Sequence, residues 1–197
     1  MQHVTTRDFR TEDATARYAI QAQGSSFTVR AFATGVLSMF GHSPTIAIQD
    51  FEGKVDVNPE AIEQAHLRFV IHSTSLMVID DISKKDRDEI NRTMHEEVLE
   101  SSSFPDIAYE CSRLSASKTG NGEYWLALNG DLTLHGVTRG LPVSARVSLN
   151  GDSLRAAGDF SVRMSDYEIG PVSAAAGTVK LKDELKLSFN IVARKQA

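Results

Sequence analysis

Apolar and polar residues alternate along most of the chain with a period of two. The alternation is clearest in two runs on either side of the turn sequence His135-Gly136. A period of two places successive side chains on opposite faces of a strand. One face is apolar in both runs, and it is formed by Tyr124, Leu126, Leu128, Leu132, Leu134, Val143, Ala145, Val147 and Leu149. The pattern predicts an antiparallel hairpin that buries one side.

Similar alternating runs cover much of the remaining sequence. The first of them is interrupted at Gly24-Ser25, where we expect a kink or a bulge. Further strands are expected at residues 45–49, 51–57, 67–72, 107–114, 154–164 and 179–193. Because short one-sided strands are not stable alone, we expect them to associate into a curved sheet with one apolar face.

One segment, residues 83–101, has a helical period instead. Ile90, Met94 and Val98 are spaced four apart, which places them along one stripe of a helix. Ser83 stands three residues before Asp86, an arrangement that caps the start of a helix. The predicted fold class is therefore all-β with one helix between mid-chain strands, and the charged side of that helix is expected to face water.

The composition is that of a folded, mildly acidic protein. The 197 residues are 41% hydrophobic and 24% charged, which suits one domain with a sizeable core. We expect a polar N-terminal arm at residues 1–17 and a single domain at residues 18–197. The net charge of -5 argues against a general nucleic-acid binder, which needs a basic surface to neutralise phosphates. The single cysteine, Cys111, is expected to be a buried apolar residue.

Nothing in the sequence predicts a membrane-spanning helix or a signal peptide. No apolar run approaches the roughly 18 residues that a transmembrane helix needs, and residues 1–17 are rich in charge. The chain as written is expected in the cytoplasm, with a periplasmic location if a leader has been removed.

Several separated motifs resemble the YceI-like family of lipid-binding, lipocalin-shaped β-barrels. The most specific is the hairpin sequence Gly-Asp-Leu-Thr-Leu-His-Gly-Val-Thr-Arg at residues 130–139. The accompanying motifs are Tyr18-Ala19-Ile20, Ser103-Phe104-Pro105-Asp106-Ile107, Phe160-Ser161-Val162-Arg163 and Tyr167-Glu168-Ile169-Gly170. The resemblance covers roughly residues 18–194 and implies an antiparallel, lipocalin-like barrel of about eight strands.

Members of this bacterial family enclose a long polyisoprenoid chain, such as a quinone or an isoprenoid phosphate. The resemblance therefore implies a lipid-binding protein that acts as a carrier, store or sensor and is not an enzyme. It implies no cofactor apart from the bound lipid. The partners it implies are the amphiphilic lipid, a membrane surface touched transiently, and a second copy of the chain in a homodimer. Without the resemblance, a barrel of this size favours an interior that its own side chains fill.

If the barrel is hollow, its lining follows from the inward phase of each strand. The predicted ligand-binding residues are Phe27, Val29, Phe69, Ile71, Leu126, Leu128, Leu132, Leu134, Phe160, Val162, Leu187 and Phe189, together with Phe40 in a glycine-flanked apolar loop. Each of them also fits an ordinary core position, and the loop around Phe40 fits either a gate or a plug. Only a continuous unfilled volume between these residues would make the group a binding site.

A lipid headgroup would need polar partners. The candidates are Arg30, His135 and Arg163, because arginine can bind a phosphate with two hydrogen bonds and histidine can bond a quinone oxygen. Ordinary solvated or structurally paired side chains are the competing interpretation of these residues.

Two other functional classes stay open on the sequence alone. One is a solid-cored, homodimeric interaction module, for example a stress-related protein without a ligand. The other is a small-barrel enzyme that acts on an isoprenoid. Asp131 and His135 share a strand face, but at about 3.3 Å per residue they lie roughly 13 Å apart. The sequence also contains no phosphate-binding loop, serine-hydrolase elbow or metal-binding histidine pair, which makes the enzyme the less favoured class.

Overall fold

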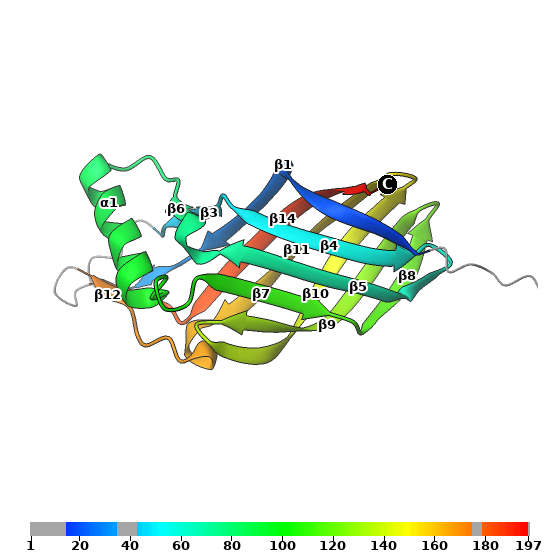
Figure 1. Ribbon diagram of the computed structural model, residues 1–197. Coiled ribbons are helices and arrows are strands. Elements are labelled where there is room, and N and C mark those ends of the chain that lie inside the picture. The colour runs from blue at the N-terminus through cyan, green and yellow to red at the C-terminus, as the bar shows by residue number, and fades with distance from the viewer. Residues whose placement is uncertain (1–14, 35–42, 175–178, 197) are drawn as a thin grey trace, which may run out of the picture.

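The computed structural model describes residues 15–34, 43–174 and 179–196. Its main sheet closes into an antiparallel barrel of 8 strands, which confirms the predicted fold class (Figure 1). The ring is closed by pairing between the first and last strands. In order around the barrel the strands are β1 (Ala16–Arg30), β4 (Phe51–Asn58), β5 (Ala61–His72), β7 (Asp106–Cys111), β9 (Glu123–Leu134), β10 (Val137–Asn150), β11 (Ser153–Arg163) and β14 (Glu184–Lys195).

Shorter strands extend the barrel wall. β3 (Thr45–Ile48) pairs with the second half of β1, and β6 (Leu76–Val78) pairs with β3. β8 (Leu114–Gly120) continues the line of β7 and pairs with β9. A small second sheet is formed by β2 (Ala33–Thr34), β12 (Ser173–Ala174) and β13 (Val179–Leu181).

Strand β1 bends where the sequence predicts a bulge. Its register with β14 shifts between Gln21 and Ser26, and Gly24 has a φ of +86°, a conformation that strongly favours glycine. Before the bulge β1 pairs with β4, and after it β1 pairs with β3. The bulge therefore lets a single strand pass from one neighbour to another as the barrel closes.

The predicted hairpin is formed by β9 and β10. Leu134 lies opposite Val137, and the two residues between them, His135 and Gly136, have φ values of 51° and 75°. Two consecutive positive φ angles are typical of the tight turns that match the twist of antiparallel strands.

The predicted helix lies across one end of the barrel (Figure 1). It begins as α1 (Lys84–Thr93) and ends in a wider π-type turn, Met94–Val98. The Ser83 hydroxyl accepts a hydrogen bond from the backbone N–H of Asp86 at 3.1 Å, which confirms the predicted cap. Met94 and Leu99 are buried, so the apolar stripe faces the barrel interior. Among the residues that the model covers, no helix is long and apolar enough to cross a bilayer.

Two predicted strands are wrong in their extent. The run at residues 107–114 is divided between β7 and the start of β8, because Ser112 and Arg113 belong to neither strand. The alternation at residues 179–193 predicts a continuous strand, but the structure divides it into β13 and β14. At the break, the Asp183 carboxylate accepts hydrogen bonds from the backbone N–H and the hydroxyl of Ser165, at 2.8 and 2.6 Å. These contacts come from a distant segment, and they turn the chain so that β13 pairs with β2 instead of continuing β14.

Candidate functional site: an apolar cavity inside the barrel

A cavity of about 580 Å³ occupies the barrel interior. Every strand of the barrel contributes side chains to its lining, and almost all of them are apolar. Several inward-facing residues are only half-buried, because their inner surfaces border empty space instead of other side chains. These residues are Leu67, Leu132, Phe160, Leu187 and Phe189. The interior is therefore hollow, and its volume is in the range of small-molecule binding sites, about 300–1,000 Å³.

The predicted lining residues that the structure describes all border this one cavity. They are Phe27, Val29, Phe69, Ile71, Leu126, Leu128, Leu132, Leu134, Phe160, Val162, Leu187 and Phe189. The pairing of β11 with β14 runs without a shift from Ser153 to Arg163, which keeps Val162 in phase with Phe160. Phe40 lies outside the described residues. Whether these side chains bind a ligand stays a prediction.

A group of aromatic rings borders the cavity where the two halves of the core meet. Phe27 contacts Phe69, Phe160 and Phe189, with ring centroids 5.7, 6.2 and 6.1 Å apart. Phe160 and Phe189 pack against both halves of the core, the one beneath the helix and the one at the opposite end. An occupant that fills the whole cavity contacts these rings.

Tyr109 is a lining residue that the sequence analysis did not select. Its hydroxyl donates to the backbone carbonyl of Leu141 at 3.0 Å and accepts from the backbone N–H of Gly130 at 3.1 Å. Burial, with smaller effects from neighbouring groups, raises the pKa of Tyr109 well above its usual range. The hydroxyl is satisfied by the wall, so Tyr109 presents an apolar ring to the cavity. The inward phase of β7 was the available signal, because Ile107, Tyr109 and Cys111 alternate and Cys111 is buried as predicted.

The cavity reaches the surface under helix α1. Ile90, Met94 and Val98 line it with the apolar stripe of the helix, and the exposed residues Asp86 and Glu89 border it nearby. The other side of this opening is lined by the small second sheet, with Ala33, Ser173 and Leu181, and by Val172 just before it. We call this opening the mouth. Its described polar lining is more acidic than basic.

The three headgroup candidates lie outside the cavity. Arg30 and Arg163 are exposed on the outer face, because they alternate with the inward residues Val29 and Val162. Arg163 borders a separate outer depression of about 240 Å³. His135 sits in the hairpin turn, where its ring lies 4.4 Å from the Phe104 ring and its Nε2 lies 3.5 Å from the Glu100 carboxylate. None of the three lines the cavity, and whether any of them binds a headgroup stays a prediction.

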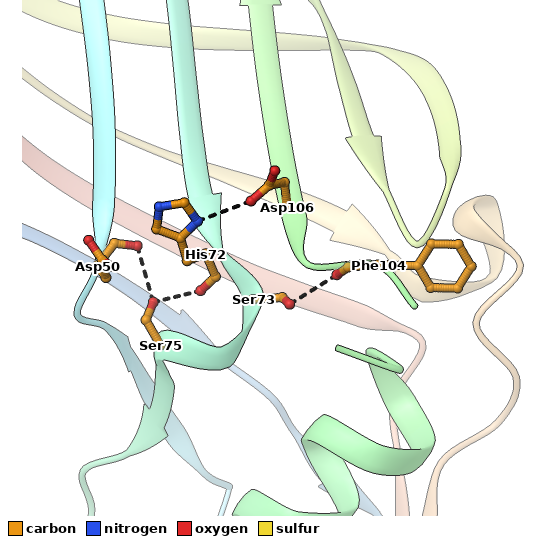
Figure 2. Close-up of polar contacts among 6 residues, drawn as sticks. All are labelled: Asp50, His72, Ser73, Ser75, Phe104 and Asp106. Carbon is orange, nitrogen blue, oxygen red and sulfur yellow. Dashed lines mark hydrogen bonds and ion pairs between the residues drawn. The ribbon is translucent and has the colours of Figure 1, made fainter. Parts of the chain in front are cut away.

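A polar cluster holds the rim where the chain leaves the barrel for the helix (Figure 2). The Ser73 hydroxyl donates to the Phe104 carbonyl at 2.9 Å, and the Ser75 hydroxyl lies 3.1 Å from the Asp50 carbonyl. His72 Nδ1 lies 3.0 Å from an oxygen of Asp106. These contacts join the ends of β4, β5 and β7, so the cluster has a structural explanation. Within the described part of the chain, no group of His, Cys, Asp and Glu side chains is arranged to hold a metal ion.

Comparisons with known proteins agree with this architecture. A family model described as the YceI-like domain matches residues 18–193. No curated protein is significantly similar to the chain.

Several solved structures share the fold. BcnA of Burkholderia cenocepacia superposes with a TM-score of 0.64 at 18% identity, covering 88% of this chain and 98% of that one. A polyisoprenoid-binding domain from Saccharophagus degradans, implicated in plant cell wall breakdown, has a TM-score of 0.63 at 12% identity, covering 91% and 98%. A YceI protein of Campylobacter jejuni has a TM-score of 0.58 at 16% identity, covering 77% and 85%.

Proposed function

We propose, from the premise that the chain belongs to the YceI-like domain family, that it binds a long amphiphilic lipid of the polyisoprenoid type in its barrel. The tail would lie in the apolar cavity and the headgroup at the mouth. The observation that carries this proposal is the continuous hollow interior of about 580 Å³. The Saccharophagus degradans domain, which is described as polyisoprenoid-binding, supports it by analogy. The alternative of a solid-cored interaction module requires an interior that side chains fill, and the cavity argues against it.

The size of the cavity sets the length of tail that it can enclose. A methylene group takes up about as much room as a water molecule in the liquid, roughly 30 Å³, so a cavity of about 580 Å³ holds at least about 20 carbon atoms. This corresponds to at least about four isoprene units. A much longer tail would have to extend through the mouth or enlarge the barrel.

The energetics favour exchange with membranes over irreversible capture. Burying about 20 carbons at about 0.8 kcal/mol each stabilises the tail by roughly 16 kcal/mol relative to water. In a bilayer the same tail is already out of water, so the free energy of moving it into the protein is small. It depends on packing, chain ordering and headgroup contacts. Such a protein acts as a carrier, store or sensor.

We propose binding without catalysis because the lining offers little for chemistry. Acid–base catalysis needs a titratable group within hydrogen-bonding reach of the reacting atom. Tyr109 uses its hydroxyl to hold the wall, and Asp86 and Glu89 border the mouth at the surface. The deep lining consists almost entirely of aliphatic and aromatic side chains.

Mass spectrometry of the purified protein tests this proposal. Under native conditions we expect a mass above that of the polypeptide, and under denaturing conditions we expect the polypeptide and a released polyisoprenoid lipid. The ligand-free protein should also take up such a lipid from vesicles. An empty native mass, together with no uptake from vesicles, would contradict the proposal.

Variants of β9 and β14 locate the binding site. Leu128→Trp and Phe189→Trp fill the cavity and should abolish uptake. Asn129→Trp places the same bulk on the outer face of β9 and should leave uptake unchanged. Circular dichroism and thermal unfolding establish that each variant is folded. Normal uptake by the folded Leu128→Trp and Phe189→Trp variants would rule out the barrel as the site.

A further inference from the structure

The outer face beside the mouth carries a cluster of basic residues around one aromatic ring. The Arg30 guanidinium carbon lies 5.8 Å from the centre of the Phe32 ring, and the Lys182 and Lys186 ammonium nitrogens lie at 5.9 and 5.8 Å. Within about 6 Å a cation is attracted to the face of an aromatic ring. None of the three basic side chains forms an ion pair with a residue that the structure describes. In a chain with a net charge of -5, this concentration of positive charge is a local exception.

Exposed apolar side chains lie on the same face, two strands away. Lys186 of β14 is opposite Arg30 of β1, and Arg30 is opposite Thr45 of β3. The backbone N–H of Ile79, just after β6, donates to the carbonyl of Thr45 at 3.0 Å. Residues opposite each other in neighbouring strands point to the same face. Ile79 and Met77 are 51% and 41% exposed, whereas Val78 between them is buried.

These residues adjoin the mouth of the cavity. Ala31 and Ala33, on either side of Phe32, line the cavity, and so does Leu181 beside Lys182. The Lys182 backbone N–H donates to the Phe32 carbonyl at 2.8 Å, which joins the two segments at the rim. We call Arg30, Phe32, Met77, Ile79, Lys182 and Lys186 the rim patch.

Three carboxylates next to the rim patch, Asp80, Asp183 and Glu184, each have a positive or hydrogen-bonding neighbour of their own. Asp80 accepts from the Thr45 backbone N–H at 2.6 Å, and Asp183 accepts from Ser165. Glu184 lies opposite Arg163 in the register of β11 and β14. The basic side chains around Phe32 are therefore left to act on a partner outside the molecule.

We propose that the rim patch docks the mouth of the barrel on an anionic membrane surface. The basic side chains would lie among negatively charged headgroups, and Phe32, Met77 and Ile79 would enter the interfacial region. Basic residues near such a surface and apolar side chains at the interface both contribute to binding. Docking of this kind places the mouth where a lipid tail can pass between bilayer and cavity without crossing water.

Co-sedimentation of the full chain with vesicles tests the proposal. The vesicles are phosphatidylcholine alone, or phosphatidylcholine with phosphatidylglycerol, and contain no polyisoprenoid, so the outcome does not depend on whether the cavity binds one. We expect binding to the anionic vesicles and not to the neutral ones, and we expect loss of binding at high salt. A protein that fails to bind anionic vesicles at low salt overturns the proposal, whatever its lipid uptake.

Charge-neutralised variants locate the docking surface. Each basic residue contributes about a fivefold change in affinity near an anionic surface, so the triple variant Arg30→Gln, Lys182→Gln and Lys186→Gln should bind about 100-fold more weakly. The matched control is Lys118→Gln, Arg146→Gln and Arg155→Gln, which removes the same charge elsewhere on the barrel, near the exposed Trp125. An equal loss in the two triple variants would show that net charge, and not the rim patch, is responsible.

A fluorescent reporter tests the orientation directly. Trp125 is the single tryptophan of the chain and lies outside the rim patch. In the protein with Trp125→Phe and Phe32→Trp, anionic vesicles should shift the tryptophan emission to the blue. The unmodified protein should show no shift. A blue shift in the unmodified protein and none in the double variant would mean that the membrane meets the Trp125 side of the barrel. That result would overturn the proposed orientation.

Discussion

Phe27 of β1 and Phe189 of β14 lie opposite each other in register, and their rings meet edge to face inside the cavity at 72°. Phe27 is almost fully buried, whereas Phe189 is only half-buried because its ring borders the empty volume. The same residue type thus occupies a packed position and an unpacked position within one aromatic group.

The two rings should therefore differ in their effect on stability. Phe27→Ala should reduce the free energy of unfolding by about 3–5 kcal/mol, as is usual for a packed ring. Phe189→Ala should cost only about 2 kcal/mol, because less surface leaves contact with other side chains. Denaturant unfolding of the ligand-free variants measures both values. Equal costs would indicate that the interior is filled in solution.

Gly158 allows the Phe189 ring to lie against the backbone of β11. A Cβ atom at residue 158 would overlap the Ser144 carbonyl oxygen and lie 2.9 Å from Phe189 Cζ. Gly158→Ala should therefore reduce the free energy of unfolding by about 1–3 kcal/mol. It should also weaken lipid uptake, because the displaced Phe189 ring moves into the cavity.

Gly140→Ala is the matched control. A Cβ atom there would meet only the Asp131 carboxylate, at 3.8 Å. We expect a change in the free energy of unfolding within about 0.5 kcal/mol, and normal uptake. A Gly158→Ala variant as stable as Gly140→Ala would contradict the close approach of β10 and β11 at this point.

Alkaline pH should destabilise the fold through its buried tyrosines. Burial raises the pKa of Tyr18, Tyr109 and Tyr167 above the ordinary value of about 10. Below pH 10 or so these groups are protonated in both states, so their contribution to stability is complete. As the pH rises further, the unfolded chain loses protons that the folded chain retains, and the free energy of unfolding falls.

Denaturant unfolding at a series of pH values between about 8 and 11 measures this effect. Tyr109→Phe should show a shallower decline, because one of the three groups is removed. It should also lose about 1–3 kcal/mol at neutral pH, since the Leu141 carbonyl and the Gly130 N–H are left without the hydroxyl. A decline as steep as that of the unmodified protein would show that Tyr109 ionises normally in the fold.

The elements that follow from local pattern were predictable, and those that depend on distant contacts were not. The bulge near Gly24, the hairpin turn at His135 and the cap at Ser83 each depend on residues close in sequence. The inward phase of each strand was equally predictable, because a shift of one residue would turn every apolar side chain to the outside. The break before β14 depends on Ser165, which is far from Asp183 in the chain.

The hollow interior could not be derived from the sequence either. Whether eight strands leave a cavity depends on how side chains from opposite walls meet, and alternation says nothing about that distance. The resemblance to known barrels, and not the pattern itself, favoured a cavity. The position of Arg30 was predictable, since its alternation with the inward residue Val29 already places the arginine on the outer face.

The acidic mouth should discriminate between lipid headgroups. Glu89 borders the cavity and is exposed, and Asp86 beside it is part of the helix cap. A phosphate headgroup would meet repulsion there, whereas a quinone would not. At roughly 10 Å in water, replacing a negative by a positive charge is worth about 0.8 kcal/mol, or about a fourfold change in affinity. Glu89→Lys should therefore increase uptake of an isoprenoid phosphate about fourfold and leave uptake of an isoprenoid quinone unchanged.

Glu97→Lys is the control for this charge effect. Glu97 is exposed on the same helical segment but does not line the cavity, so its replacement makes the same change in net charge away from the mouth. Uptake of both lipids from vesicles, measured at low and at high salt, distinguishes the two variants, because salt screens charges at this separation. A fourfold gain in uptake of the isoprenoid phosphate with Glu97→Lys as well would show that the overall charge of the protein attracts the phosphate. No gain in uptake with either variant would place the headgroup away from α1.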